Sequence, residues 1–281
     1  MIHPTALVDP KAELADDVEV GPSAIIEAGA QIGARSRILA HAVIKGCVRM
    51  GSENEVGYGA ILGADPQDLS FKKETPSEVI IGNRNTIREY VTIHRGAVAE
   101  SQTMVGDENY LMVGVHLGHN VQLHNKIVIT NNCLLAGYVE VQDRAVLGGG
   151  SVFHQFIKIG TLAMVRGGSR ISKNIPPYLM AYESNLVSGL NVVGLRRSGM
   201  SMETRMEIKK AFRFIYRMGL NVSDALQAAR QQAWSAEAIA FFDFIEQSSK
   251  RGICKIASRG NVAGEEEERG GPHSSTSGAK K

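Results

Sequence analysis

Three residues spaced eighteen apart, His119, Gly137 and Gln155, form the part of this sequence best suited to chemistry. An imidazole whose pKa lies near neutrality can take a proton from a hydroxyl group. A glycine leaves its backbone N–H uncovered, and such a donor can stabilise an oxyanion. His116 and His154 lie close to this set in the sequence. The pattern predicts proton abstraction beside an oxyanion site, provided that the fold aligns positions eighteen apart.

A hexapeptide repeat supplies that alignment. Between Val105 and Pro176 the sequence divides into twelve consecutive blocks of six, and each block opens with Val, Leu, Ile or Phe. A helix repeats about every 3.6 residues and a strand every second residue, so neither explains this period. A solenoid does, because each block forms one flat face and its first side chain points into the core. Three faces close one coil in hexapeptide solenoids, so residues eighteen apart stack about 4.8 Å apart.

The same repeat begins near the N-terminus, with ten blocks from Ile2 to Ile61. The fifth position is often small or β-branched, which suits a second inward side chain. A polar segment with two prolines predicts a loop over about residues 62–80, which carries Gln67 and Asp68. A shorter break follows at residues 99–104. Glycine often stands second in a block, where we expect a corner with positive φ; the examples are Gly21, Gly33, Gly51 and Gly57.

The period changes after residue 178. We expect a β-helix over residues 1–178, a linker over 179–200, a helical domain over 201–250 and a disordered tail over 251–281. Apolar residues three and four apart predict the helices, and Ser201, Ser223 and Ser235 are the expected N-caps. The tail is low in complexity and contains the run GEEEERGG.

Composition excludes several classes of protein. The net charge of +2 does not indicate a nucleic-acid partner, and 43% hydrophobic residues are ordinary for a globular protein. The sequence contains no apolar run of about 18 residues, so no membrane span is predicted. No signal pattern precedes the repeat, so we expect a cytoplasmic protein. Three cysteines without CxxC spacing predict free thiols. No His, Asp and Glu spacing typical of a zinc enzyme occurs, so we expect neither a metal nor another cofactor.

Six longer motifs are more specific than the bare repeat: IREYVTIHRG (87–96), HLGHN (116–120), LLAGYV (134–139), VFHQF (152–156), PPY (176–178) and GLNVVGLRR (189–197). Together they resemble the UDP-N-acetylglucosamine O-acyltransferase family of lipid A biosynthesis, from Met1 to about Lys250. The resemblance implies a mostly β protein, with a left-handed parallel β-helix and a small C-terminal α-helical domain. It also implies a homotrimer with active sites in clefts between neighbouring chains.

The resemblance implies a specific reaction as well. An (R)-3-hydroxyacyl chain would move from acyl carrier protein to the 3-position of UDP-N-acetylglucosamine, the first step of lipid A biosynthesis. His119 matches the general base, and Gly137 matches the residue whose N–H holds the oxyanion. Neither a covalent intermediate nor a metal is needed. Nucleotide-sugar and acyl contacts match Gln67, Asp68, His116, His154 and Gln155.

Three further positions match residues farther along the family's motifs. Asn191 and Arg197 match groups on the uridine–diphosphate side. Gly167 matches the position that stops the acyl chain, and a glycine there predicts a chain nearer 14 carbons than 10. Because acyl carrier protein is acidic, basic residues near the cleft would help it to dock; the candidates are Arg166, Arg170 and Lys173.

Five residues depart from the family's commonest pattern. Asn120 stands where an Asp usually follows the base, and an Asn carries no charge to support an imidazolium. The other departures are Ser70, Tyr138, Val193 and Ser198. They leave open an acyltransferase that acts on another nucleotide sugar, such as a 3-amino analogue. A non-catalytic hexapeptide trimer and a metal-dependent hexapeptide carbonic anhydrase are the remaining alternatives.

Overall fold

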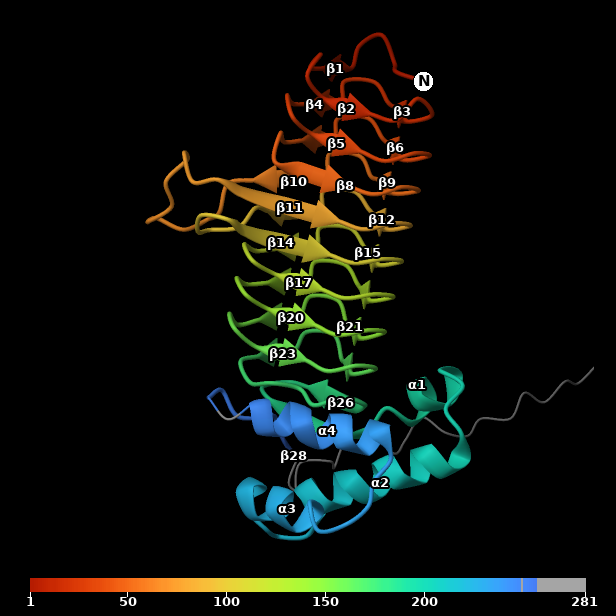
Figure 1. The fold of residues 1–281 in the computed structure, drawn as a ribbon, viewed down its shortest axis with the longest axis vertical. Helices are drawn as coiled ribbons and strands as arrows, with labels where there is room; N and C mark the ends of the chain where they lie inside the picture. Colours follow the sequence, from red (N-terminus) through yellow and green to blue (C-terminus); the bar gives the residue numbers. More distant parts are fainter. Residues whose placement is uncertain (249, 257–281) are drawn as a thin grey trace, which may run out of the picture.

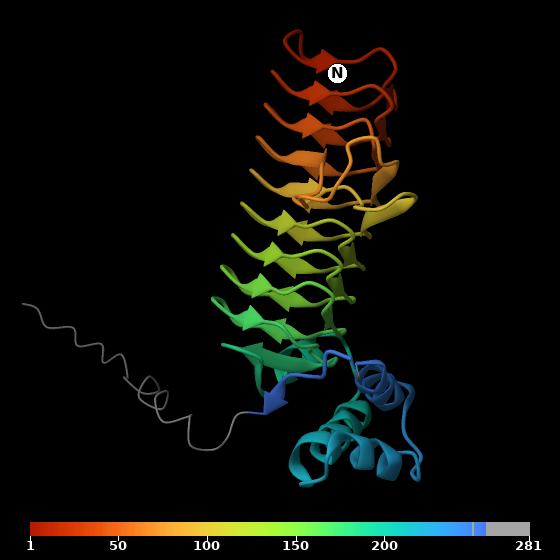
Figure 2. The same ribbon diagram turned by 90° about the vertical axis from the view of Figure 1, so that its left-hand side faces the viewer.

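The computed structural model describes residues 1–248 and 250–256. The chain winds into a left-handed parallel β-helix of three sheets, and a helical domain lies at the end opposite the N-terminus (Figure 1). Figure 2 shows the successive coils stacked in one column. The described residues therefore confirm the predicted fold class.

Strands of two, three or more residues build each face. The nine-stranded sheet contains β1 (Leu7–Val8), β4 (Ile25–Ile26), β7 (Val43–Ile44), β10 (Ile61–Ala64), β13 (Thr92–His94), β16 (His116–Leu117), β19 (Leu134–Leu135), β22 (Val152–Phe153) and β25 (Arg170–Ile171). The eight-stranded sheet contains β2 (Glu13–Leu14), β5 (Gln31–Ile32), β8 (Val48–Met50), β11 (Ser77–Ile81), β14 (Ser101–Val105), β17 (Gln122–Leu123), β20 (Glu140–Val141) and β23 (Lys158–Ile159).

The third sheet has eleven strands and reaches into the C-terminal part of the chain. It contains β3 (Glu19–Val20), β6 (Arg37–Ile38), β9 (Glu55–Val56), β12 (Thr86–Ile87), β15 (Tyr110–Leu111), β18 (Val128–Ile129), β21 (Val146–Leu147), β24 (Met164–Val165), β26 (Leu179–Tyr182), β27 (Leu186–Leu190) and β28 (Lys255–Ile256).

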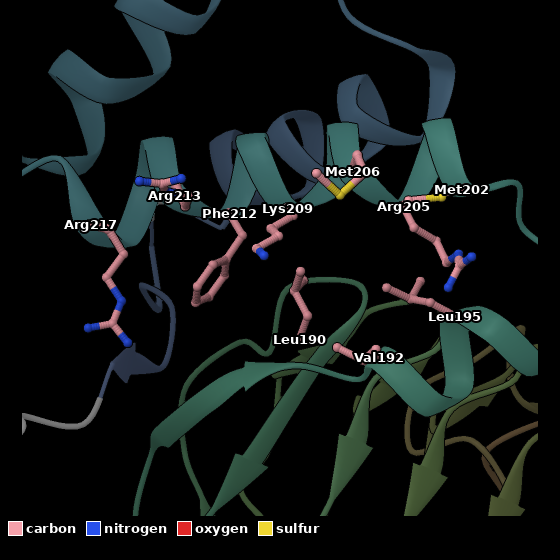
Figure 3. A pocket seen from close by; sticks show the side chains of 10 residues that line it. All are labelled: Leu190, Val192, Leu195, Met202, Arg205, Met206, Lys209, Phe212, Arg213 and Arg217. Atoms are coloured by element: carbon pink, nitrogen blue, oxygen red, sulfur yellow. The ribbon is translucent and has the colours of Figure 1, made fainter.

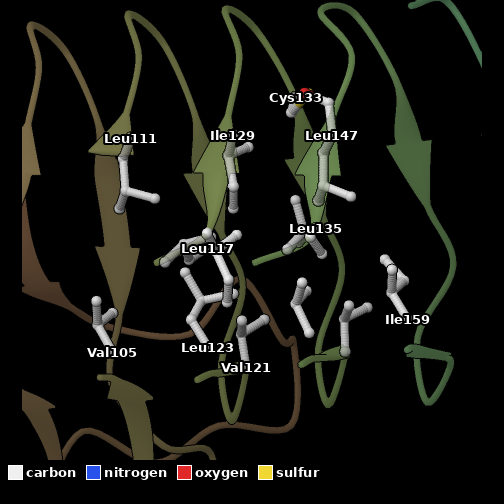
Figure 4. Packing of buried hydrophobic residues seen from close by; sticks show 14 of the residues in the cluster. Val105, Leu111, Leu117, Val121, Leu123, Ile129, Cys133, Leu135, Leu147 and Ile159 are labelled. Atoms are coloured by element: carbon white, nitrogen blue, oxygen red, sulfur yellow. The ribbon is translucent and has the colours of Figure 1, made fainter. Parts of the chain in front are cut away.

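The register of the parallel strands places residues eighteen apart directly opposite one another. His116 pairs with Leu134, and Leu134 pairs with Val152, each in a parallel ladder. The first residue of each block points inward, as Figure 4 shows for Leu111, Leu117 and their neighbours. The fifth position is the second inward position, and Val121 and Cys133 there are fully buried. Apolar side chains one coil apart therefore form continuous columns along the core.

The backbone conformation of the glycines at the corners differs from the prediction. Positive φ occurs at the fourth position of a block and is adopted by residues such as Ser23 (57°) and His41 (61°). The second-position glycines do not have positive φ. They are needed because the next coil passes too close: a Cβ on Gly57 would lie 2.5 Å from the carbonyl carbon of Arg88. Close approach of backbones, and not turn conformation, selects glycine at these positions.

The inserted loop is narrower than predicted. Strands β10 and β11 use both ends of the range 62–80, so residues 65–76 form the segment outside the sheets. It projects sideways from the column in Figure 1 and lies in front of the column in Figure 2. The short break expected at residues 99–104 lies earlier in the chain, because β14 begins at Ser101 and pairs with β11, so residues 95–100 form the segment outside the sheets.

The range predicted as a linker is structured. It contains β26, β27 and the helix α1 (Val192–Arg197). The three expected helices are α2 (Met202–Arg217), α3 (Val222–Ala229) and α4 (Ala236–Gln247). Ser201 and Ser235 cap α2 and α4 as predicted, but Asn221 and not Ser223 caps α3. Within the described residues, no helix is long and apolar enough to cross a membrane.

The first part of the predicted tail belongs to the fold. Strand β28 pairs with β27, and the buried Cys254 accepts a hydrogen bond from Tyr216 of α2 at its carbonyl oxygen (3.1 Å). The expectation of disorder from residue 251 is therefore wrong for residues 251–256. Residues 257–281 lie outside the described part of the chain.

Truncation of one side chain in a core column tests whether apolar packing holds the coils together. Leu111 is fully buried, so Leu111→Ala removes apolar contacts and leaves a cavity. We expect the free energy of unfolding, measured by urea denaturation, to fall by about 2–5 kcal/mol. Leu7→Ala is the control because Leu7 is 67% exposed, and it should change stability by less than about 0.5 kcal/mol. Equal losses in the two variants would contradict the packing described above.

Candidate active site

A cavity of about 400 Å³ lies on the outer side of the nine-stranded sheet, where β16, β19 and β22 end. Five residues singled out in the sequence line it, namely Gln67, His116, His119, Gly137 and Gln155. The other lining residues are His94, Gly118, Leu134, Leu135, Ala136, Val152 and Phe153. The β-helix therefore brings His119, Gly137 and Gln155 to one edge, as the eighteen-residue spacing predicts.

His119 is held by its neighbour Asn120. The backbone N–H of Ala97 donates to Asn120 Oδ1 (3.0 Å), which identifies this atom as the oxygen of the amide. The same oxygen lies 3.1 Å from His119 Nδ1, so Nδ1 carries the proton and donates. The other ring nitrogen, Nε2, is then unprotonated. Asn120 thus fixes the tautomer in which His119 Nε2 can accept a proton.

Gly137 gives the imidazole its space. A Cβ on Gly137 would lie 2.6 Å from His119 Nε2 and 2.5 Å from Cε1, so any larger residue would displace the ring. Among the described residues, no hydrogen-bond acceptor is found for the Gly137 N–H. An unprotonated imidazole nitrogen and a free amide donor therefore face the same cavity. This pair can remove a proton from a hydroxyl and stabilise an oxyanion.

His94 lines the cavity, although the sequence analysis did not single it out. Its ring meets that of His116 at 4.9 Å in an edge-to-face contact, and its Nδ1 is buried without a partner among the described residues. Burial, with the charges of His116 and His119, lowers the pKa of His94 to about 4. Burial also lowers the pKa of His116, whose Nδ1 lies 2.8 Å from Thr92 Oγ1.

The sequence offered two signals for His94: its place in the motif IREYVTIHRG and the short break in the repeat that follows it. In the structure, β13 pairs with β16 so that Thr92 stands opposite His116. The two residues are twenty-four apart because the chain between β13 and β14 adds six residues. A register that allowed for this break would have placed His94 beside the cavity.

Arg95 holds the loop that carries Gln67 and Asp68 through hydrogen bonds to both ends of the loop. Its guanidinium donates to the carbonyl oxygens of Thr75 (2.7 Å) and Lys73 (2.8 Å) and to Asp65 Oδ1 (3.0 Å). It also lies 4.9 Å from the ring centroid of Phe71. These contacts hold both ends of the loop against the nine-stranded sheet.

Asp68 lies in a local turn of the same loop. The amide and hydroxyl of Ser70 donate to its carboxylate, and they hold the pKa of Asp68 below its usual range. The charge of His119 contributes less in the same direction. Asp68 is exposed beside the cavity and does not line it.

An aromatic column flanks His119. Tyr138 meets the imidazole edge-to-face at 5.2 Å and stacks on Phe156 at 4.7 Å. Arg251 covers the Phe156 ring, with its guanidinium carbon 5.6 Å from the centroid. Tyr138, Phe156 and Arg251 stay outside the cavity lining. Tyr138, one of the five departures from the family's commonest pattern, therefore packs against the imidazole.

Four predicted residues lie away from this cavity. His154 points to solvent, with its Nδ1 3.2 Å from the carbonyl oxygen of Gln155. Gly167 follows β24 and so lies at the corner after the eleven-stranded sheet. Asn191 is buried and caps α1, since its side chain donates to the Leu162 carbonyl oxygen (2.9 Å) and accepts from the Gly194 amide (2.9 Å). Arg197 ends α1.

Curated relatives match this chain over nearly their whole length. An acyl-[acyl-carrier-protein]–UDP-N-acetylglucosamine O-acyltransferase from Halorhodospira halophila is 44% identical over 257 residues, which are 90% of this chain and 99% of that protein. The enzyme of the same name from Burkholderia orbicola is 40% identical over 261 residues, with the same coverage. The chain belongs to this O-acyltransferase family.

Other comparisons agree with membership of the O-acyltransferase family. The family model for domain 2 of UDP-N-acetylglucosamine O-acyltransferases matches residues 174–254, the part that contains β26, β27 and α1 to α4. The solved enzyme from Bacteroides fragilis has 40% identity and a TM-score of 0.85 over 90% of this chain and 99% of its own. The Francisella novicida enzyme has 33% identity and the same TM-score, over 92% and 95% of the two chains.

Stability at acidic pH tests the buried state of His94. A free histidine has a pKa near 6.5, whereas His94 has a pKa of about 4, so below pH 6.5 the unfolded chain binds a proton that the folded chain does not. We expect stability to fall as the pH is lowered from 6.5 to 4, by up to about 3 kcal/mol from this residue. His94→Gln should flatten that part of the profile in urea titrations at several pH values. An unchanged slope in the variant would contradict the assignment.

Proposed function

We propose that this protein transfers an (R)-3-hydroxyacyl chain from acyl carrier protein to the 3-position of UDP-N-acetylglucosamine, the first step of lipid A biosynthesis. The observation that carries the proposal is the pairing of an unprotonated His119 Nε2 with the Gly137 N–H on one cavity. The names of the curated relatives support the same donor and acceptor. Because those names specify an O-acyltransferase, they favour a hydroxyl acceptor over an amine.

The chemistry follows from these two groups. His119 Nε2 takes the proton of the sugar hydroxyl while its oxygen attacks the thioester carbonyl carbon. The carbonyl oxygen becomes an oxyanion, and the Gly137 N–H donates to it. The C–S bond then breaks, the carrier leaves as a thiol that receives the proton, and the ester remains. Asn120 orients the imidazole through a neutral hydrogen bond, so support for the imidazolium is weaker than an aspartate would give.

A trimer would complete the site. His119 lies at the corner after the nine-stranded sheet, whereas Gly167, Asn191 and Arg197 lie after strands of the eleven-stranded sheet. One chain therefore does not bring the proposed base and the proposed acyl and uridine contacts to one cavity. Exposed apolar side chains are present on both sheets, such as Leu134 on the first and Met164 on the second. Packing of one sheet against the other in a neighbouring copy would bury them and unite the two half-sites.

The carrier protein would dock on the helical domain. Helix α2 presents a row of cations at intervals of four residues, namely Arg205, Lys209, Arg213 and Arg217. This row is denser than the set proposed from the sequence, which is Arg166, Arg170 and Lys173. In that set, Lys173 donates to the Arg251 carbonyl oxygen (3.3 Å), and Arg166 lies over the Tyr182 ring at 5.8 Å. An acidic carrier is attracted to such a row at low ionic strength.

Removal of the imidazole tests the base. We expect His119→Ala to lower kcat for acyl transfer by roughly 10²–10⁴-fold, because the hydroxyl proton loses its acceptor. His124→Ala is the matched control, since His124 pairs with Glu140 far from the cavity lining and should keep near-normal turnover. The measurement is transfer from 3-hydroxyacyl carrier protein to UDP-N-acetylglucosamine and to its 3-amino analogue. Wild-type turnover in His119→Ala would exclude His119 as the base.

Gly167 sets the expected chain length. A side chain there would project into the proposed acyl groove, so Gly167→Met should shift the preference from 14-carbon toward 10-carbon donors. A Cβ at this position would come within 3.0 Å of the Gly149 carbonyl oxygen, so Gly167→Ala controls for the small backbone shift. The ratio of kcat/KM values for the two donors is the readout. The same ratio in all three proteins would contradict the role of Gly167.

A further inference from the structure

A groove of about 720 Å³ lies between α2 and the segment of β27 and α1 (Figure 3), and it shares no lining residue with the cavity that contains His119. Its floor is apolar and includes Leu190, Leu195 and Phe212. Its rim is the cationic row of α2 already described, in which Lys209, Arg213 and Arg217 are exposed. In the part of the chain that the structure describes, no carboxylate pairs with any of the four cations. The groove therefore suits an acidic segment with some apolar residues.

This chain supplies such a segment itself. The match with the curated relatives covers 99% of their length but 90% of this chain, so the chain has residues that those relatives do not share. Residues 257–281 include Glu265–Glu268, four consecutive carboxylates preceded by Val262 and Ala263. The described chain ends at Ile256 in β28. That strand lies beside α2, because the Cys254 carbonyl oxygen accepts from Tyr216, the residue before Arg217.

We propose that Glu265–Glu268 dock on the α2 row and compete with an acidic acyl carrier protein. The length of the connection permits this. Nine residue steps from Ile256 to Glu265 span at most about 30 Å. The row from Arg217 to Arg205 is about 18 Å long on the helix axis, so every cation is within reach. Tethering gives the glutamates an effective concentration near the row that is on the order of millimolar.

Docking of the tail would regulate access of the acyl donor to the enzyme. This inference rests on the proposed function, in which the acyl carrier protein binds the same row of cations. Four exposed charge pairs are individually weak, and salt screens them beyond about 8 Å at physiological ionic strength. The tail therefore acts as a reversible, salt-sensitive competitor. It leaves the catalytic cavity and the acceptor sugar unaffected.

Zero-length cross-linking of carboxylates to lysines in the full-length protein tests the contact directly. Lys209 lies on the groove, whereas Lys210 points away from it, with its Nζ 4.6 Å from the Trp234 ring centroid. We expect peptides joining Glu265–Glu268 to Lys209, few or none to Lys210, and loss of the Lys209 product at 1 M salt. Absence of the Lys209 product, or equal yields at the two lysines, would overturn the proposal.

Kinetics test the consequence. Replacing Glu265, Glu266, Glu267 and Glu268 together by Gln keeps the length of the tail and removes its charge. We expect KM for the acyl carrier protein to fall roughly fivefold at low salt, with kcat and KM for the sugar unchanged. Lys280→Gln with Lys281→Gln is the matched control and should not lower KM. An unchanged KM for the carrier in the Gln variant would overturn the competition.

The cross-linking and the kinetic experiments separate the docking of the tail from the proposed acyl transfer. The cross-link does not depend on any activity, so it decides whether the tail docks even if the proposed reaction is wrong. A full-length protein that transfers no acyl chain would contradict the proposed function and leave the cross-linking result standing. A Lys209 cross-link without a kinetic effect would show that the carrier docks on another surface, and the competition would then be rejected.

Discussion

The structure depends on parallel strand pairing at an interval of eighteen residues. Each coil places its inward side chains over those of the coil before it, so Leu111, Ile129 and Leu147 follow one another in the same sheet. Every backbone ladder bond reinforces this register. A shift by one residue would turn the apolar column to solvent and the outward residues into the core. The same constraint that builds the core therefore fixes which outward residues stand in line.

The proposed catalytic cavity follows from that register with little added structure. His119, Gly137 and Gln155 share one corner because they share one position of the repeat. What distinguishes this corner from others is chemical: an imidazole occupies the space that a side chain at Gly137 would take. Asn120 and Tyr138, both at corner positions with positive φ, then hold the ring from two sides. A rigid scaffold thus orients the proposed base with only a few specialised residues.

Breaks in the repeat supply what the regular coil lacks. The loop of residues 65–76 leaves the column and is brought back by Arg95, so Gln67 reaches the cavity. The second break places Ala97, whose amide fixes the orientation of Asn120. At the C-terminal end, helices replace coils, and α2 presents a row of cations. The proposed recognition of the donor and of the nucleotide sugar therefore depends on irregular segments.

The sequence alone determined the period, the inward positions and the alignment of His119 with Gly137 and Gln155, because a fixed repeat length turns sequence distance into spatial distance. It also marked the start of α2 and α4 through their serine caps. Only the tertiary structure decided what depends on the breaks and on close approach. His94 joins the cavity because six inserted residues change the register, and Asn191 proves to be a buried cap. Glycines at the second position serve backbone contact and not positive φ, since neighbouring coils, which local sequence does not reveal, pass within 3 Å of a Cβ there.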